Sequence, residues 1–191
     1  MRVLVAYYTQ TGNTRKIAQA IHSELESLGH EVTLREIRGV KSQDVSGFDV
    51  IFLGSPCHSA DLAKPVRNLL EAMESSPGGK LAGFVTHSTY TAEGGERHRE
   101  LHERWAGKCA GSFEQACAAK GLEWSGCFSC QGKPSKPIEL FIRVAVIKDA
   151  HEWPGYIAET RKHPNADDEA KARAFAREVV ALGDTYPISP R

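Results

Sequence analysis

The sequence predicts an α/β protein with a parallel β-sheet that is covered by helices on both faces. Short apolar segments rich in β-branched residues alternate five times with segments whose apolar residues recur at helical spacing. Several of these apolar segments are almost continuously hydrophobic, as is typical of strands buried on both faces. The length of 191 residues, the 41% hydrophobic content and the formal net charge of zero suit one globular domain rather than a disordered chain.

The first strand and helix are the most clearly marked. Residues 2–8 are apolar and rich in β-formers, and the polar turn 9–14 separates them from a helix that begins at Arg15 and ends before Gly29. The next strand, 31–37, alternates apolar with charged residues, which favours an edge position. The apolar side of the helix is formed by Ile17, Ile21, Leu25 and Leu28.

Three further strands are expected at 50–53, 81–86 and 122–130. The first of these is expected to stop at Gly54-Ser55-Pro56, because glycine and proline interrupt strands. Helices are expected at 62–73 and 96–120, with a break at Pro77-Gly78-Gly79 between strand and helix. The last helix starts at an Asn165 N-cap with acidic residues in its first turn. Its apolar face consists of Phe175, Val179 and Leu182.

Residues 132–164 do not fit the alternation. They lie between the fifth strand and the last helix, where a short connection is expected. Their content of Ile, Leu, Val, Trp and Tyr is too apolar for a loose linker. We therefore expect a single domain over residues 1–191 with an insertion at 132–164 that packs on the domain.

Composition excludes several classes of protein. The 24 basic and 24 acidic residues balance, which gives no global attraction to nucleic acid. No apolar run approaches the roughly 20 residues of a membrane span, and residues 3–6 are too short a run for a signal peptide. Five cysteines are an odd number for a disulfide framework. A cytoplasmic protein with reduced thiols is the simplest interpretation.

The turn after the first strand carries the strongest functional signal. Thr9, Gln10, Thr11, Gly12, Asn13 and Thr14 offer hydroxyl, amide and backbone N–H donors at the positive end of a helix, which suits a phosphate group. Gly12 permits a tight bend. The loop contains no lysine or arginine and matches neither G-x-x-x-x-G-K-[ST] nor G-x-G-x-x-G. The alternative is that these residues only cap the helix.

With this loop the sequence resembles the flavodoxin family, whose [ST]-x-T-G-x-T pattern is matched by Thr9, Thr11, Gly12 and Thr14. The resemblance covers residues 1 to about 130 and the last helix. It implies a flavodoxin-like three-layer sandwich with a five-stranded parallel sheet in the order 2-1-3-4-5. It also implies non-covalently bound FMN at the carboxyl ends of the strands, where the strand order reverses.

Two further loops should then meet the flavin ring. One contains Ser55, Pro56, Cys57 and His58, and the other contains Thr86, His87, Ser88, Thr89 and Tyr90. The first loop lacks the Trp or Tyr that many small flavodoxins stack on the flavin. His58 or Pro56 is a substitute on that side of the ring, and Tyr90 is one on the other. His87 either forms a structural hydrogen bond or assists chemistry at the ring.

Other candidate groups have simpler interpretations. Cys127 and Cys130 have redox or metal spacing, but residues three apart in a strand point to opposite faces. Cys57 is expected to contribute packing rather than a reactive thiol. His98 and His102 share a helix face, but their charged neighbours indicate a solvated face rather than a metal site.

The leading hypothesis is an electron-transfer protein that exchanges electrons with redox partner proteins through FMN and needs no catalytic residue of its own. The first alternative is an NAD(P)H-dependent FMN or quinone reductase, with residues 132–164 covering a substrate pocket. The second is a partner-binding module without redox chemistry, against which the intact loop argues. Small flavodoxins are strongly acidic, whereas this chain is neutral. Either a local acidic patch guides partners, or the protein has a different partner or its own substrate.

Overall fold

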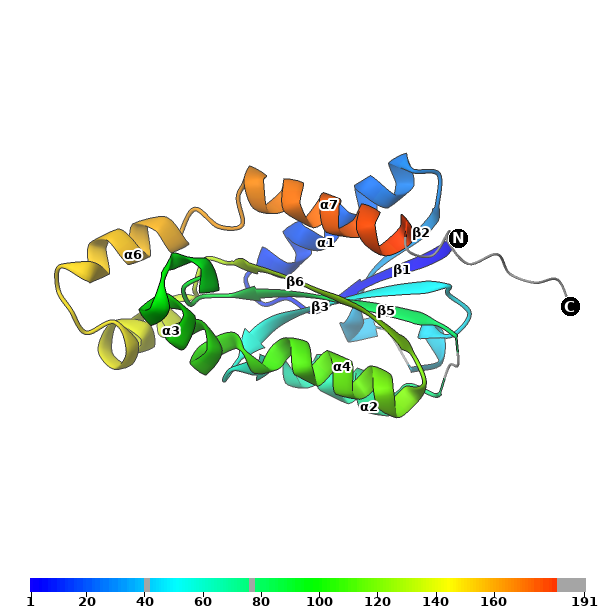
Figure 1. The fold of residues 1–191 in the computed structure, drawn as a ribbon, viewed down its shortest axis with the longest axis horizontal. Coiled ribbons are helices and arrows are strands. Elements are labelled where there is room, and N and C mark those ends of the chain that lie inside the picture. The colour runs from blue at the N-terminus through cyan, green and yellow to red at the C-terminus, as the bar shows by residue number, and fades with distance from the viewer. Residues whose placement is uncertain (40–41, 76–77, 182–191) are drawn as a thin grey trace, which may run out of the picture.

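In the computed structural model, which describes residues 1–39, 42–75 and 78–181, a twisted parallel sheet lies between two layers of helices (Figure 1). This is the three-layer α/β sandwich that the sequence predicts. Within the described ranges, every helix is too short or too polar to cross a membrane. Two residues given structural roles above, Pro77 and Leu182, lie outside the described residues.

The sheet has the order β2-β1-β3-β5-β6, and its neighbouring strands all pair in parallel. Counted without the short β4, this is the predicted order 2-1-3-4-5. The half-polar second strand occupies an edge, as its pattern indicated. A short hairpin adds β4 antiparallel to the end of β3. The bounds are β1 Arg2–Tyr7, β2 Glu31–Glu36, β3 Val50–His58, β4 Asp61–Leu62, β5 Lys80–His87 and β6 Glu123–Gln131.

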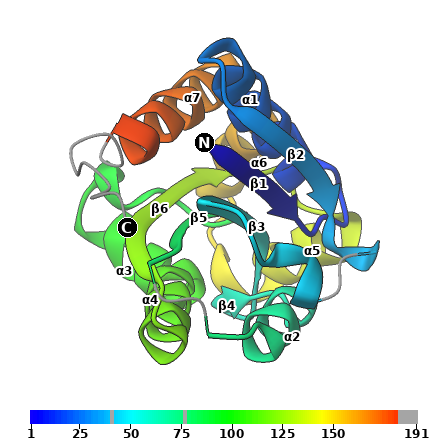
Figure 2. The same cartoon turned by 90° about the vertical axis from the view of Figure 1, so that its right-hand side faces the viewer.

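Two hydrophobic cores form because successive strand residues point to opposite faces of the sheet. Helices α1 (Asn13–Ser27) and α7 (Ala166–Ala181) cover one face, where Val5 and Phe52 lie. Helices α2 (Lys64–Ala72) and α4 (Lys108–Lys120) cover the other face, where Leu4 and Leu53 lie. Figure 2 shows the two helical layers on either side of the strands, viewed along the sheet.

Strand β3 is longer than the sequence predicted. It was expected to stop at Gly54, yet it continues through His58, with Gly54, Ser55 and Pro56 in register with β5. Gly54 is needed for close approach rather than for a turn, since a Cβ there would lie 2.2 Å from the Phe84 ring. The Gly-Ser-Pro sequence is therefore part of the sheet, and the turn falls at Ser59 and Ala60, which both have positive φ.

The helix expected at 96–120 is divided into α3 (Glu96–Ala106) and α4 at Gly107. The prediction of one helix was wrong in this respect. A Cβ at Gly107 would lie 2.6 Å from the Glu103 carbonyl oxygen, so the backbone is tighter there than in a regular helix. The break gives α3 and α4 separate roles: α4 covers the sheet, and α3 lies beyond the strand ends (Figure 1).

Residues 132–164 form α5 (Lys136–Phe141), the π-helical turn η4 (Ile142–Val146) and α6 (Glu152–Thr160). A small core of Ile142, Ile147, Tyr156 and Ile157 holds the segment together, with Tyr90 packed against it. The segment lies at the carboxyl ends of the strands, beside α3 (Figure 1). The shorter 3-10 turns are η1 (Ile37–Gly39), η2 (Ser42–Val45) and η3 (Ala92–Gly94).

Candidate functional site

A cavity of about 780 Å³ opens at the carboxyl edge of the sheet. Its volume lies within the usual range of about 300–1,000 Å³ for small-molecule sites. One side, here called the inner wall, is formed by the loop after β1 with the start of α1, by the end of β3, and by the end of β5 with the turn that follows it. These segments supply Gln10, Thr11, Asn13, Pro56, Cys57, His58 and residues 86–90. The cavity thus brings together the three segments that the sequence assigned to a cofactor.

The loop between β1 and α1 is held by its own side chains. Gly12 has φ of 89°, and its N–H donates to Thr9 Oγ1 at 3.0 Å. The hydroxyls of Thr14 and Thr86 lie 2.9 Å apart in the buried interior and join this loop to the end of β5. Thr9 and Thr14 are buried, whereas Thr11 is exposed to the cavity. The three threonines therefore have different positions: two fix the loop, and Thr11 is exposed at the cavity.

The loop has a lysine neighbour that sequence reasoning missed. The Asn13 amide donates to the Lys133 carbonyl oxygen at 2.9 Å across a separation of 120 residues, and Lys133 is one of the residues that line the cavity. Gly132 makes this approach possible, because a Cβ there would lie 2.6 Å from Asn13 Nδ2. A loop without a cation in its own sequence thus has one beside it in the fold.

The hairpin from β3 to β4 contributes Pro56, Cys57 and His58 to the cavity. Ser55 points elsewhere: its buried hydroxyl accepts from the Ala63 N–H at 2.9 Å and donates to the Pro56 carbonyl oxygen at 2.8 Å. The side chain of Ser55 therefore fixes the hairpin and the start of α2. Burial, reinforced by the nearby Arg67, lowers the pKa of His58, which keeps its imidazole neutral near pH 7.

All five residues from Thr86 to Tyr90 line the cavity, and neighbouring elements fasten this loop. Ser88 Oγ donates to the Gly132 carbonyl oxygen at 2.9 Å, and Thr89 Oγ1 donates to the Leu101 carbonyl oxygen at 3.3 Å. The Tyr156 hydroxyl donates to the Ser88 carbonyl oxygen. A loop fixed at several points needs little reordering when a ligand binds, which favours affinity.

His87 is the most perturbed group of the inner wall. Its side chain is 3% exposed, and burial, assisted by the charge of His102, lowers its pKa to about 3. The two imidazole rings lie 4.9 Å apart, edge to face. Nδ1 of His87 is buried and has no hydrogen-bond partner among the described residues. The imidazole is therefore neutral at physiological pH, with one polar atom unsatisfied.

Tyr90 is engaged by protein groups on three sides. Its ring stacks on His98 with centroids 3.8 Å apart, and its hydroxyl donates to Glu152 Oε1 at 2.7 Å. His102 Nδ1 lies 3.0 Å from the Tyr90 carbonyl oxygen. The prediction of a solvated face for the two histidines of α3 was wrong, because both pack on this loop. Burial, together with the Glu152 hydrogen bond, raises the pKa of Tyr90.

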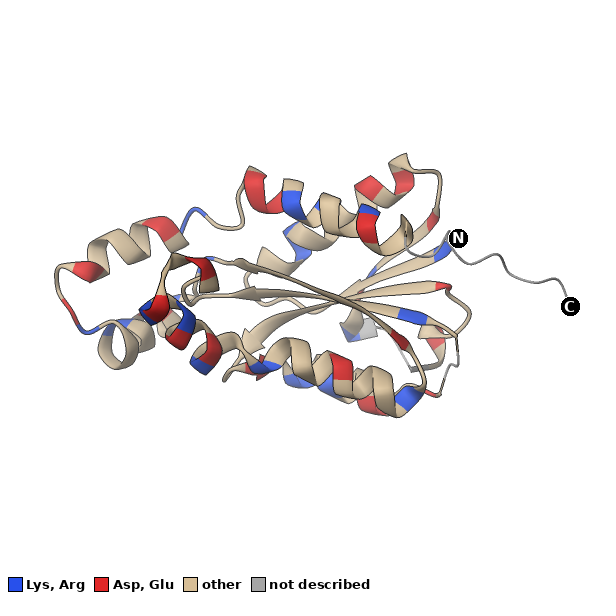
Figure 3. Cartoon of the chain, in the orientation of Figure 1, with Lys and Arg blue, Asp and Glu red and all other residues tan. Residues whose placement is uncertain are grey.

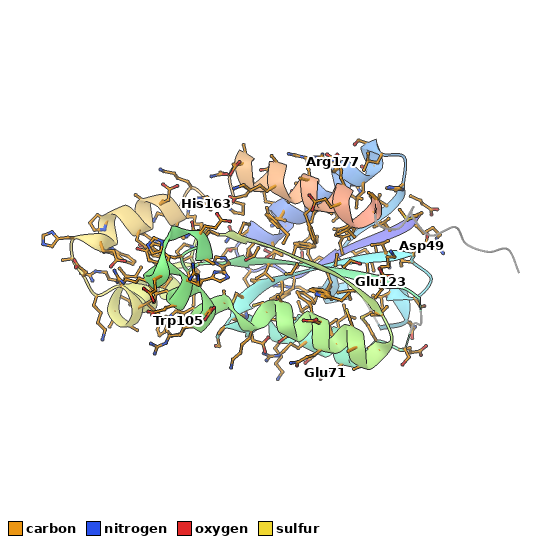
Figure 4. The ribbon with its side chains drawn as sticks, in the orientation of Figure 1. Asp49, Glu71, Trp105, Glu123, His163 and Arg177 are labelled. Atoms are coloured by element: carbon orange, nitrogen blue, oxygen red, sulfur yellow. The ribbon has the colours of Figure 1, made fainter. Side chains whose placement is uncertain are left out.

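The other side of the cavity, here called the outer wall, is apolar and was missed by sequence reasoning. It consists of Trp105 from α3 and, from residues 132–164, Ile138, Phe141, Ile142, Val146, Ile147 and Tyr156. The rings of Trp105 and Phe141 meet edge to face at 5.6 Å, so α3 and α5 touch at the cavity. Figure 4 labels Trp105 near this end of the molecule, opposite Asp49, Glu71 and Glu123.

The charged side chains that line the cavity are all cationic. Among the described residues, the lining includes Arg104, Lys108 and Lys133 but no aspartate or glutamate. Acidic residues are present nearby on α3 and α6, as Figure 3 shows, but they do not reach the cavity surface. A local acidic patch was one way in which a neutral chain could guide its partners. The described lining of the cavity contains no such patch.

The five cysteines are free. Cys127 packs in the core under α2 and α4, and Cys130 packs in the core under α1 and α7, which confirms that they point to opposite faces. Burial raises the pKa of the Cys127 thiol to about 12 and also raises that of Cys130. Cys57 donates to the Trp105 carbonyl oxygen at 3.1 Å. Its thiol thus links the inner wall to the start of the outer wall.

Comparison with known proteins supports the fold and the family. A flavodoxin domain model matches residues 4–177. A flavodoxin of Aquifex aeolicus is 28% identical over 95 residues, which cover 49% of this chain and only 51% of the relative's length. The flavodoxin-like domain-containing protein BilS of Clostridioides difficile is 23% identical over 187 residues, 94% of this chain and 97% of its own.

A solved structure shows the same fold. Oxidised flavodoxin 2 of Bacillus cereus superposes with a TM-score of 0.63 at 21% identity, covering 95% of this chain and 99% of its own. At this level of identity the likeness concerns the arrangement of strands and helices. It agrees with the strand order and the two helical layers described above.

Proposed function

The chain belongs to the flavodoxin domain family, and on this premise we propose that it binds FMN non-covalently and exchanges electrons with redox partner proteins. The observation that carries the proposal is the convergence of the T-x-T-G-x-T loop with the loops after β3 and β5 on one cavity. FMN would supply one- and two-electron redox chemistry. The protein would supply the binding site for FMN and the surface through which redox partners reach it.

The residues of the cavity fit the parts of this cofactor. Thr11, Gln10 and the N-terminus of α1 suit a phosphate group, because hydroxyls, an amide and unpaired helix N–H groups are anion donors. Lys133 adds a cation at the same place. The polar residues 86–90 and the Pro56–His58 segment suit the two sides of a planar ring. The unsatisfied Nδ1 of buried His87 is a further polar atom in that region.

The residues proposed to form the cofactor site have two kinds of role. Those that contact FMN directly are Gln10, Thr11, Asn13, Pro56, Cys57, His58, Thr86, His87, Ser88, Thr89 and Tyr90. Thr9, Gly12, Thr14 and Ser55 are proposed to hold these residues in place. The hydroxyls of Thr9, Thr14 and Ser55 are bonded to protein atoms, and Gly12 has a left-handed φ.

The test is the purified protein itself. We expect a yellow protein with flavin absorption, about one flavin per chain, and FMN as the flavin released on denaturation. A colourless protein that fails to take up added FMN would contradict the proposal. Reduction by dithionite should be reversible in air if the protein only holds and relays electrons.

One observation favours a second candidate, an NAD(P)H-dependent FMN or quinone reductase. The outer wall covers part of the cavity, and Arg104 and Lys108 beside it add cations, which an electron carrier with an open ring edge does not need. Anaerobic mixing with NADH and then NADPH separates the two candidates. Rapid bleaching of the flavin indicates the reductase, and absence of bleaching indicates the carrier.

Two broader assignments are also proposed. We propose one domain over residues 1–191 in which 132–164 is an insertion, because this segment has its own small core yet completes the cavity. We also propose a cytoplasmic location, since all five cysteines are free.

A further inference from the structure

Two cations on the outer side of the cavity have no ion-pair or hydrogen-bond partner among the described residues. Arg104 near the end of α3 and Lys108 at the start of α4 are four residues apart, and both residues line the cavity. Neither forms an ion pair or a hydrogen bond with any residue that the structure describes. The Arg104 guanidinium instead lies over the Trp105 ring, 5.4 Å from its centroid. Arg104 and Lys108 are called the cation pair below.

The cation pair is separate from the proposed phosphate site. The phosphate loop leads into α1, which packs on the face of the sheet that carries Val5 and Phe52. The cation pair precedes the buried part of α4, whose Cys109 and Phe113 pack on the opposite face. The phosphate loop and the cation pair thus adjoin α1 and α4, two helices that lie on opposite sides of the sheet (Figure 1).

The surface beside the cation pair is apolar. Trp105 and Phe141 present aromatic rings, and Ile142, Val146 and Ile147 extend the wall away from the polar loops. Aromatic and aliphatic walls favour planar rings, which bury area on both faces. Two unpaired cations beside such a wall favour a ligand that carries negative charge.

We propose that this side of the cavity is a second binding site, for a planar organic anion: an aromatic or heteroaromatic ring that carries a carboxylate, sulfonate or phosphate group. The ring packs on Trp105 and Phe141, and the anionic group lies at the cation pair. The proposal rests on the proposed function in one respect, because it assumes that FMN occupies the inner wall. It concerns binding alone.

Two kinds of molecule share this chemistry. One is a nicotinamide dinucleotide, in which phosphates carry the charge beside a planar ring. The other is an aromatic acid with its charge attached directly to the ring. The same two interactions would stabilise either complex. The anionic group would pair with the cation pair, and the ring would bury apolar surface of the outer wall.

The experiment uses the FMN-loaded protein and calorimetric titration. The probes are anthraquinone-2-sulfonate, its neutral counterpart 2-(hydroxymethyl)anthraquinone, and NADP⁺. We expect the sulfonate to bind about 10-fold more tightly than the neutral probe at low salt. The difference should shrink in about 0.5 M NaCl, because exposed charges are screened.

The double variant Arg104→Gln/Lys108→Gln should raise the Kd of the sulfonate about 10-fold and leave the neutral probe within about twofold. The matched control is Lys120→Gln/Lys171→Gln, which removes the same charge elsewhere. Lys120 ends α4 and donates to the Glu71 carbonyl oxygen, and Lys171 pairs with Asp167 on α7. Glu71 is labelled in Figure 4 at the end of the molecule away from Trp105. The control should change neither Kd.

The outcomes distinguish a dinucleotide from an aromatic acid as the ligand, and they distinguish failure of this inference from failure of the proposed FMN binding. If the double variant weakens NADP⁺ more than the sulfonate, a dinucleotide is the natural ligand; the reverse indicates an aromatic acid. Equal Kd values for charged and neutral probes, or a double variant that behaves like the control, would overturn the inference. If the cation pair only attracts an acidic protein partner, the double variant should behave like the control. Loss of flavin from the unmodified protein contradicts the proposed function instead.

Discussion

The inner and outer walls of the cavity are built on different principles. The inner wall is mostly polar, and several of its side chains are bonded to protein atoms, as Thr86 is to Thr14. The outer wall is apolar and partly open to solvent, with Ile138 48% and Phe141 45% exposed. A pre-ordered polar wall suits tight retention of one ligand, whereas an exposed apolar wall suits reversible contact. Under the proposed function, the inner wall would retain FMN and the outer wall would control access to it.

The largest effect is expected at the inner wall, from Thr11→Asp. A carboxylate at this exposed position would face the phosphate, and like charges about 4 Å apart near a protein surface repel by about 4 kcal/mol. We expect the Kd of FMN to rise at least about 100-fold, measured by flavin fluorescence. Thr11→Asn is the matched control, because it has the same shape without the charge. Equal flavin retention by both variants would show that Thr11 is not beside the phosphate.

The burial of His87 in the inner wall can be tested through the pH dependence of the free energy of unfolding. Its pKa is about 3 in the folded protein and near 6.5 when unfolded, so between these values the unfolded chain binds more protons. Stability from this group is complete above about pH 6.5 and is lost as the pH falls toward 3. At about 1.4 kcal/mol per pKa unit, the loss reaches about 2 kcal/mol by pH 5.

Replacing His87 by Gln should remove that part of the acid sensitivity. Urea unfolding at about pH 7.5 and pH 5 should show the free energy of unfolding falling by about 2 kcal/mol less in His87→Gln than in the unmodified protein. His151→Gln, at an exposed position, is the control and should keep the original difference. If the free energy of unfolding of both variants depends on pH as it does in the unmodified protein, burial of His87 does not cause the acid sensitivity.

Gly132→Ala tests where the two walls join. The new Cβ would lie 2.6 Å from Asn13 Nδ2 and would displace the hydrogen bond to the Lys133 carbonyl oxygen. A hydrogen bond is worth about 0.5–1.5 kcal/mol, so we expect the Kd of FMN to rise by up to about 10-fold. Gly155→Ala in α6 meets no atom within 4 Å and should leave it unchanged. The same affinity in both variants would mean that Asn13 does not position the loop.

The sequence predicted the inner wall well because its signals are local. A strand, a T-x-T-G-x-T turn and a helix follow each other in the chain, and parallel strands bring their carboxyl ends to one edge. The outer wall depends on contacts between distant residues, such as Trp105 with Phe141 and Asn13 with Lys133. No spacing rule reveals such pairs. The apolar content of residues 132–164 indicated a packed segment but gave no information about what it covers.

Local signals also misled where tertiary context decided the outcome. Gly54, Ser55 and Pro56 have turn-forming composition, yet β5 extends alongside them and draws them into the sheet. Gly107 lies in a segment of helical pattern, yet the chain divides into α3 and α4 at this residue. In both cases a glycine has little room for a Cβ, which composition alone does not distinguish from a turn.

The smallest effect is expected at the outer wall, from Phe141→Leu. This change removes the edge-to-face contact with Trp105, and such contacts are worth about 0.5–1.5 kcal/mol. Because Phe141 is half exposed, we expect the free energy of unfolding to fall by about 1 kcal/mol or less. The Kd of FMN should stay within about twofold, since the inner wall is untouched. Leu140→Ser, at a position that is 66% exposed, is the control and should change neither quantity. If Phe141→Leu releases FMN as strongly as Gly132→Ala, the outer wall takes part in retention, and the division of roles between the two walls is wrong.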